Sequence, residues 1–266
     1  MKYFECDGMQ LSTIWHCFGN YMHKVDLDQV LKMLAASRSN VIPVNTHLLG
    51  QSRSRDDLLI GFGDVTYDAL MSSIDGSGYH IFANINHQTT AADAVEKVKL
   101  CCDLAGLSIV KMEVLSEDLK TSNDTALIDA VVALREERPD LCIMPLHSSD
   151  PVVAKELADA GCPLLRVMGG PIGSRAGLMD EGAFAECCEV NVPIVLDGGI
   201  GRVEHYLRAH ELGAAGCLVN SMLFDTELQP FEVLGDFVDR ALRETDPVVP
   251  AHSEQQVDQA AKAHIV

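Results

Sequence analysis

The sequence predicts a single-domain (β/α)8 barrel, and three observations favour this fold class. Apolar runs typical of strands alternate with amphipathic stretches typical of helices along the chain, without a break in composition. The length of 266 residues is close to the roughly 250 of a one-domain barrel. Hydrophobic residues make up 47% and aromatic residues only 5%, which suits an aliphatic parallel sheet covered by helices. A doubly wound open sheet is the alternative, because element order alone does not show closure.

The predicted strands are short, β-rich apolar runs that end at glycine, proline or polar residues. They cover residues 13–18, 41–45, 79–85, 109–115, 141–146, 164–168, 192–197 and 216–220. The predicted helices show apolar residues at helical spacing and in places a cap, such as Thr90 before one helix and Asp150-Pro151 before another. They cover residues 26–36, 67–73, 91–104, 125–137, 151–161, 204–212 and 230–243. We assign residues 1–246 to the barrel and 247–266 to a polar C-terminal tail.

Charge and cysteine content exclude several classes of function. The formal net charge is −19 without a basic cluster, so we expect neither a nucleic-acid nor an anionic-membrane partner. The nine cysteines are scattered without a CxxC pair, and His87, His205 and His210 show no ligand spacing, which predicts reduced thiols and no metal. No signal peptide or long apolar span is present, so we expect a cytoplasmic protein.

The strand at 109–115 carries the most distinctive chemistry. Residues two apart on a strand share a face, so Lys111 and Glu113 point together while the apolar residues between them point away. A buried lysine loses hydration, which favours the neutral amine that forms Schiff bases, and an adjacent carboxyl can move the protons. The alternative is a surface ion pair on an edge strand.

A second group of candidates follows the last two strands, where barrel enzymes hold phosphate. Asp197 ends one strand, and the next residues, Gly198 and Gly199, allow main-chain N–H groups to approach an anion. Asn220 and Ser221 could complete this site, although the glycines could equally form a plain tight turn. The glycine-rich segment 169–177, which includes Gly170, suits a flexible lid or a wall and has neither a dinucleotide-binding nor a P-loop pattern.

Five further polar residues lie in or near the ends of predicted strands. His16, Asn45, Asn84 and His147 could hydrogen-bond sugar hydroxyls, and each could equally be a satisfied polar residue of the barrel rim. Arg166 lies within an apolar strand, where it could pair with a carboxylate or hold a phosphate.

Several motifs in this order resemble bacterial thiazole synthase, over about residues 89–221. The family's lysine strand reads Lys-Leu-Glu-Val, compared with Lys-Met-Glu-Val at 111–114. Its loops read much like Ser-Asp-Pro-Val at 149–152, Gly-Pro-Ile-Gly-Ser at 170–174, Val-Leu-Asp-Gly-Gly-Ile-Gly at 195–201 and Leu-Val-Asn at 218–220.

The resemblance implies a barrel enzyme in which Lys111 forms an imine with a sugar phosphate, while Glu113 and Asp197 act as the acid/base pair. Sulfur would come from the C-terminal thiocarboxylate of a small ubiquitin-like sulfur carrier protein, with no other cofactor. We also expect a homo-oligomer.

The sequence departs from the family in substrate-facing or partner-facing loops. It has Asn-Thr-His-Leu at 45–48, Asn-Ile-Asn-His at 84–87 and Leu-His-Ser at 146–148, and it lacks the family's serine-rich C-terminal signature. With the lysine machinery intact, this pattern suggests the same chemistry on a hexose 6-phosphate, which would give a 2-thiosugar phosphate. The alternatives are thiazole synthase proper acting on 1-deoxyxylulose 5-phosphate, a lysine aldolase, and a non-catalytic scaffold that binds a sugar phosphate or carrier protein.

Overall fold

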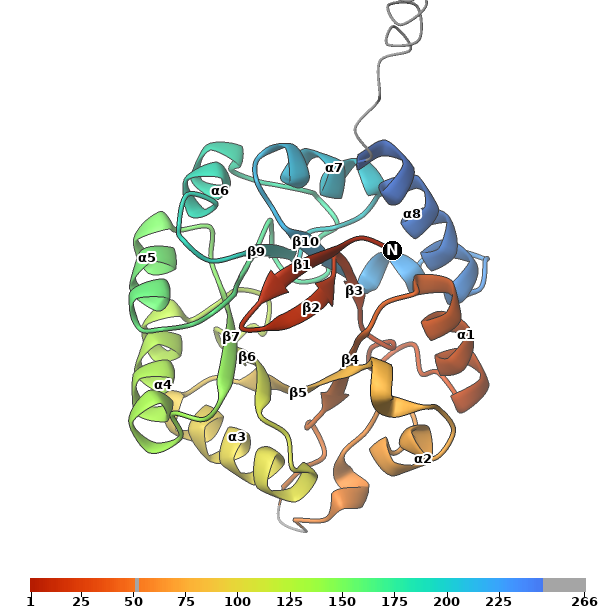
Figure 1. The fold of residues 1–266 in the computed structure, drawn as a ribbon, viewed down its shortest axis with the longest axis horizontal. Helices are drawn as coiled ribbons and strands as arrows, with labels where there is room; N and C mark the ends of the chain where they lie inside the picture. Colours follow the sequence, from red (N-terminus) through yellow and green to blue (C-terminus); the bar gives the residue numbers. More distant parts are fainter. Residues whose placement is uncertain (51–52, 246–266) are drawn as a thin grey trace, which may run out of the picture.

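Eight parallel strands form the centre of the molecule, and helices surround them (Figure 1). The computed structural model describes residues 1–50 and 53–245; the predicted polar tail at 247–266 lies outside them. The strands are β3 (Ile14–His16), β4 (Val41–Asn45), β5 (His80–Gln88), β6 (Ile109–Val114), β7 (Cys142–His147), β8 (Leu165–Val167), β9 (Ile194–Asp197) and β10 (Gly216–Val219).

The order of the strands confirms the barrel and excludes the doubly wound sheet. The sheet runs β3-β10-β9-β8-β7-β6-β5-β4, and its two end strands, β3 and β4, lie next to each other. Side chains help to bridge this seam: the Ser12 main-chain N–H donates to Asn40 Oδ1 at 2.9 Å, and Asn40 Nδ2 donates to the Gln10 carbonyl at 2.7 Å.

Two helices begin at the caps that the sequence indicates, Thr90 and Asp150, and Asp26 adds a cap that was not predicted. Asp26 forms a capping box with Gln29, Thr90 caps α3, and Asp150 caps α5 with Pro151 in the first turn. Helix α6 follows the glycine-rich loop and was not among the predicted helices. The helices are α1 (Leu27–Ser37), α2 (Tyr67–Met71), α3 (Ala91–Ala105), α4 (Asp124–Glu137), α5 (Pro151–Asp159), α6 (Glu181–Cys187), α7 (Val203–Glu211) and α8 (Pro230–Thr245), with short 3-10 turns at Arg55–Asp57, Gly76–Gly78 and Ser221–Phe224.

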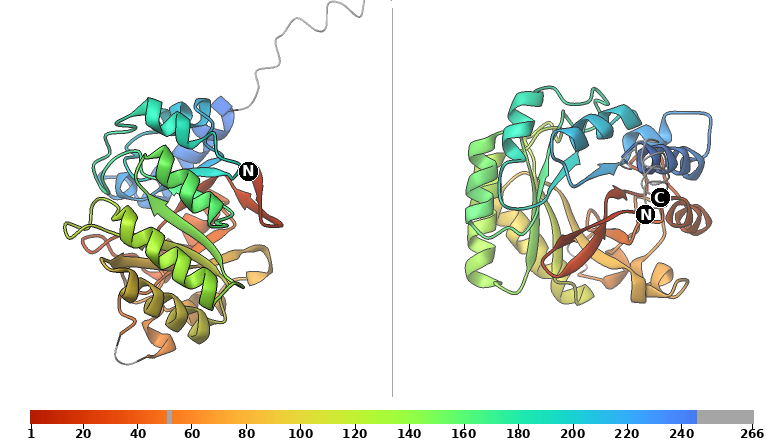
Figure 2. Two further views of the ribbon diagram at one scale, coloured as in Figure 1. Left: turned by 90° about the vertical axis from the view of Figure 1, so that its left-hand side faces the viewer. Right: turned by 45° about the horizontal axis from the view of Figure 1, so that its top comes forward.

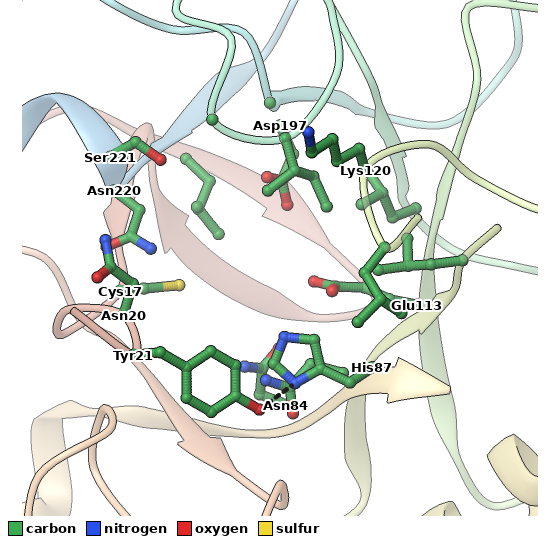
Figure 3. Close-up of a pocket in the computed structure, with 18 of the residues that line it drawn as sticks. Cys17, Asn20, Tyr21, Asn84, His87, Glu113, Lys120, Asp197, Asn220 and Ser221 are labelled. Atoms are coloured by element: carbon green, nitrogen blue, oxygen red, sulfur yellow. Dashed lines mark hydrogen bonds between the residues drawn. The ribbon is translucent and has the colours of Figure 1, made fainter. Parts of the chain in front are cut away.

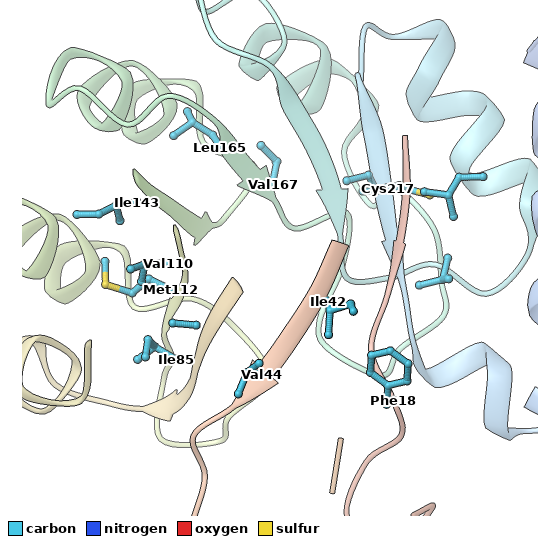
Figure 4. Close-up of a cluster of buried hydrophobic side chains, with 14 of the residues drawn as sticks. Phe18, Ile42, Val44, Ile85, Val110, Met112, Ile143, Leu165, Val167 and Cys217 are labelled. Carbon is cyan, nitrogen blue, oxygen red and sulfur yellow. The ribbon is translucent and has the colours of Figure 1, made fainter. Parts of the chain in front are cut away.

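Two apolar layers hold the barrel together. The outer layer lies between strands and helices, where alternate residues such as Val110 and Met112 of β6 point outward (Figure 4). The inner layer fills the barrel around Trp15, whose ring meets Phe82 edge-on at a centroid distance of 5.3 Å. Burial of these two surfaces is the main stabilising term of the fold.

An antiparallel hairpin, β1 (Tyr3–Cys6) and β2 (Met9–Ser12), closes one end of the barrel and was not predicted. It crosses the barrel in Figure 1, and Figure 2 shows it from two further sides. Its residues Cys6 and Leu11 belong to the inner apolar layer with Trp15. The hairpin therefore plugs the end of the barrel opposite the carboxyl ends of the strands.

Candidate active site

A cluster of four charged side chains occupies the barrel interior above the inner apolar layer. Lys111 and Glu113 come from β6, Arg166 from β8 and Asp197 from β9, and exposed fractions range from 0 to 8%. Lys111 Nζ lies 2.5 Å from Glu113 Oε1 and 3.8 Å from Asp197 Oδ2. The predicted lysine and its two carboxylates therefore meet inside the barrel, and the surface ion pair considered above is excluded.

Arg166 donates hydrogen bonds to both carboxylates, Glu113 and Asp197, and so holds them in place. Its Nη1 donates to Asp197 Oδ2 at 2.5 Å and to Glu113 Oε1 at 3.4 Å. Its other nitrogens donate to main-chain carbonyls, Nη2 to Met112 at 2.7 Å and Nε to Met144 at 3.1 Å. Arg166 does not line the cavity at the carboxyl ends of the strands, which corrects its candidacy as a contact of the sugar phosphate and supports the alternative, a carboxylate partner.

The charges in this cluster balance, two positive against two negative. Burial alone would raise the pKa of Glu113, but the neighbouring charges of Lys111 and Arg166 and the hydrogen bond from Lys111 outweigh it and lower the pKa. Glu113 is therefore a carboxylate at neutral pH and can accept the protons released when an amine adds to a carbonyl group.

Two asparagines extend the cluster along the cavity wall. Lys111 Nζ donates to Asn84 Oδ1 at 3.0 Å, Asn84 Nδ2 donates to Asn45 Oδ1 at 2.5 Å, and Asn45 Nδ2 donates to the Gly61 carbonyl at 2.7 Å. Both asparagines line the cavity, so the structure places them where the sugar contacts were predicted. They also fix the direction of the lysine ammonium.

The glycine loops pack closely behind the carboxylates. Gly198 and Gly199 follow β9 with φ of +100° and +83°. A Cβ on Gly199 would come within 2.7 Å of the Gly177 carbonyl oxygen and 2.8 Å of the Gly170 nitrogen, so only glycine fits. Gly198 and Gly199 line the cavity, together with the predicted Asn220 and Ser221, whereas Gly170 lies behind them.

The structure corrects the predictions for His16 and His147, which lie outside the cavity. The residues next to each histidine along its strand face the barrel interior, so the histidine ring points outward, between the strands and the helices. His16 Nε2 lies 3.0 Å from Ser37 Oγ. Burial lowers the pKa of both histidines to about 4, which keeps them neutral. The His147 ring nitrogens have no hydrogen-bond partner in the described part of the chain.

The cavity has a volume of about 600 Å³ and opens at the carboxyl ends of the strands, with Lys111, Glu113 and Asp197 in its lining. Figure 3 shows Glu113 and Asp197 in this lining. It also contains residues that sequence reasoning missed: Cys17, Tyr21, His87 and Lys120. Cys17 belongs to the predicted strand 13–18, where alternation with Trp15 could have found it. Tyr21 and Lys120 lie in loops and His87 lies at an irregularity of β5, so these three had no periodic signal.

The cavity lining offers one group for an anion and two acceptors for hydroxyl groups. The Lys120 ammonium forms no ion pair with any described residue, so it is free to meet a phosphate. The buried Oδ1 atoms of Asn86 and Asn220 lack a hydrogen-bond partner in the described part of the chain and are available to a hydroxyl group. Within residues 1–50 and 53–245, no cluster of three or more His, Cys, Asp or Glu residues could hold a metal, and no helix there could span a membrane.

Comparison with known proteins gives a family model and curated relatives that agree. Residues 27–230 match the family model described as thiazole biosynthesis protein ThiG. The thiazole synthase of Citrifermentans bemidjiense is 30% identical over 202 residues, which cover 74% of this chain and 72% of that relative. Among solved structures, the Amycolatopsis orientalis BexX/CysO complex contains a chain that matches with a TM-score of 0.77 at 24% identity, covering 91% of this chain and 93% of that one. Thiamine phosphate pyrophosphorylase from Pyrococcus furiosus has the same fold, with a TM-score of 0.61 at 14% identity over 88% of this chain and 97% of its own. The chain belongs to the thiazole synthase family and is a sulfur-inserting enzyme of the Schiff-base lysine type.

Proposed function

We propose that the protein forms a Lys111 imine with a phosphorylated sugar, favouring a hexose 6-phosphate, and inserts sulfur to give a 2-thiosugar phosphate. The observation that carries this proposal is the position of the lysine. Its amine lies in the wall of a 600 Å³ cavity, within 2.5 Å of one carboxylate and 3.8 Å of another. A buried amine with two proton acceptors is the arrangement that imine chemistry requires.

The reaction would begin when the Lys111 amine attacks C1 of the open-chain aldehyde and water leaves. Glu113 and Asp197 would carry protons during imine formation and the subsequent shift of unsaturation that leaves a ketone at C2. The protonated imine helps because its nitrogen accepts electrons better than a carbonyl oxygen does, and each acid/base contact is typically worth about 10²–10⁴ in rate.

Sulfur would come from the thiocarboxylate of a small ubiquitin-like carrier protein, which would attack the C2 carbonyl. The exchange replaces a carbon–oxygen bond by a carbon–sulfur bond and leaves the carrier as a carboxylate, so no oxidant, reductant or further cofactor is needed. Support for a protein partner comes from the BexX/CysO neighbour, a chain of the same fold solved in complex with a second protein.

The phosphate would lie at the mouth of the cavity, between the glycine loop and Lys120. Gly198 and Gly199 line the cavity, so their main-chain N–H groups would donate to the anion. Lys120 would add one positive charge in a protein with a net charge of −19.

A second candidate is thiazole synthase proper, acting on 1-deoxyxylulose 5-phosphate with the same lysine. The family match and the curated relatives favour it. The hexose is favoured instead by the end of β5, because the stretch 84–87 differs from the family and three of its residues, Asn84, Asn86 and His87, line the cavity. A non-catalytic scaffold is the third possibility.

Trapping the imine separates these candidates. The protein is incubated with glucose 6-phosphate or with deoxyxylulose phosphate, reduced with borohydride, and mapped by peptide mass spectrometry. We expect a hexose adduct on Lys111, which Lys111→Ala abolishes and the matched surface change Lys99→Ala retains. A pentulose adduct alone would favour thiazole formation, and the absence of any adduct would support a scaffold.

A further inference from the structure

His87 enters the cavity because strand β5 is irregular. Up to Ile85, β5 pairs with β6 in regular steps, but the next pair is Gln88 with Val114, so β5 contains one extra residue. On a regular strand, His87 would share the outward face of Ile85, and only Asn86 would face the barrel interior. With the bulge, both Asn86 and His87 line the cavity.

The backbone at His87 is strained to achieve this. Its φ of +61° lies in the left-handed region, which costs an ordinary residue about 1–2 kcal/mol. Such strain is found preferentially at functional sites, where the surrounding structure holds it in place. The strain and the bulge together direct one ring into the cavity that holds Lys111.

Tyr21 fixes the orientation of that ring. The two rings stack at a centroid distance of 5.2 Å, and Tyr21 Oη lies 3.1 Å from His87 Nδ1. Figure 3 shows the His87 ring with Tyr21 on one side and Glu113 on the other. Nε2 has no hydrogen-bond partner among the described residues, so it is available to a ligand.

Both carboxylates of the cluster already have partners. Against the effect of burial, the neighbouring charges of Lys111 and Arg166 lower the pKa of Glu113 and so weaken it as a proton acceptor. Asp197 Oδ2 accepts a 2.5 Å hydrogen bond from Arg166 and lies 3.8 Å from Lys111 Nζ. Burial lowers the pKa of His87 below its usual value of 6.5, which keeps the imidazole neutral and able to accept a proton at pH 7.

We propose that His87 Nε2, in place of the carboxylates to which the proposed function gives this step, is the general base that removes the proton from the carbon next to the imine carbon, with Tyr21 as its positioning residue. This inference rests on the proposed function and applies equally to a hexose and a pentulose substrate. The carbon–hydrogen bond breaks, and its electron pair forms a double bond to the former imine carbon. The imine π electrons move to the Lys111 nitrogen, and the proton goes to Nε2 while Nδ1–H donates to Tyr21 Oη.

For an aldose imine, the same imidazolium would then return its proton to C1. The C2 hydroxyl loses its proton to a carboxylate, and the C2 ketone forms. The His87 imidazole therefore takes the proton from C2 and delivers it to C1.

The test measures two events separately on the full-length protein. Borohydride trapping with glucose 6-phosphate and deoxyxylulose phosphate reports imine formation, and mass spectrometry or NMR in D₂O reports exchange of the adjacent carbon-bound hydrogen. We expect His87→Gln to retain the Lys111 adduct and to lose exchange at least about 100-fold. The matched change His80→Gln, at the other end of β5, should affect neither.

A chemical rescue excludes a purely structural role for the ring. Glycine adopts a positive φ without strain, so His87→Gly keeps the bulge and leaves space for a small base. Added imidazole should restore exchange in His87→Gly, and Tyr21→Phe should lower kcat for exchange with KM unchanged. Exchange within about tenfold of wild type in His87→Gln, or no rescue by imidazole, would overturn the assignment. No adduct in the wild-type protein would overturn the proposed function itself.

Discussion

Replacing Arg166 by methionine tests the balance of charge inside the barrel. Methionine has a similar length and no charge, so the change removes one positive charge and leaves the space largely filled. Lys111 alone would then face Glu113 and Asp197, and the buried cluster would carry one net negative charge. The carbonyl oxygens of Met112 and Met144 would also lose their donors.

The magnitude follows from these losses. Breaking a buried ion pair by removing one partner costs about 3–5 kcal/mol, and each buried polar group left without a partner costs about 1–3 kcal/mol. The terms overlap, so we expect the free energy of unfolding to fall by about 4 kcal/mol at pH 7, a large part of the ~5–15 kcal/mol typical of a native protein. The loss should shrink at lower pH, because protonation of a carboxylate removes the uncompensated charge.

Urea unfolding followed by circular dichroism measures this effect, with a check that the slope m is unchanged. Arg166→Met combined with Asp197→Asn restores neutrality and should recover part of the loss. The matched control is Arg208→Met, which breaks an exposed pair with Glu181 and should have little effect. A loss below about 1 kcal/mol, or a double variant no more stable than the single one, would refute the reasoning.

Three further predictions concern the cavity and the buried histidines. Gly199→Ala should raise KM for the sugar phosphate by about tenfold or more in the trapping assay, because the loop must shift away from the Gly177 carbonyl. An unchanged KM would argue against a phosphate at this loop. Lys120→Met should raise KM in the same assay with kcat unchanged and weaken its salt dependence, and a fall in kcat alone would contradict this. The pKa of His16 and of His147 is about 4 in the folded protein, against about 6.5 when unfolded, so only the unfolded state gains their protons as pH falls through this window. Stability should therefore fall by about 1.6 kcal/mol per histidine between pH 6.5 and 5, and urea titrations of His16→Gln and His147→Gln should show a smaller fall.

Much of the fold was predictable, because the apolar runs and caps are local signals. Each of the eight predicted strands overlaps a strand of the barrel. The N-terminal hairpin was missed since its strands are short and only partly apolar, although Asp7-Gly8 between them is a typical two-residue hairpin turn. Closure of the barrel depends on contacts between β3 and β4, which no local pattern contains.

The site was predictable where it depends on strand alternation. Lys111, Glu113 and Asp197 converge because parallel strands end at the same rim of the barrel. The same alternation would have excluded His16, because its neighbour Cys17 faces the cavity. His87 could not be found in this way, since the bulge reverses the direction that alternation assigns to it.

Because one end of the barrel is closed, a lysine that binds the sugar covalently would have an advantage in the proposed chemistry. The hairpin and Trp15 fill one end, so the sugar phosphate and the sulfur donor would both have to reach Lys111 through the 600 Å³ cavity at the other end. A sugar held only by hydrogen bonds could leave while the loops open for a protein partner. A covalent imine keeps it in place during that exchange and holds its reacting carbon beside Glu113 and His87. Under the proposed function, the lysine would therefore serve as a tether as well as an electron sink, and the sugar should bind before the carrier protein.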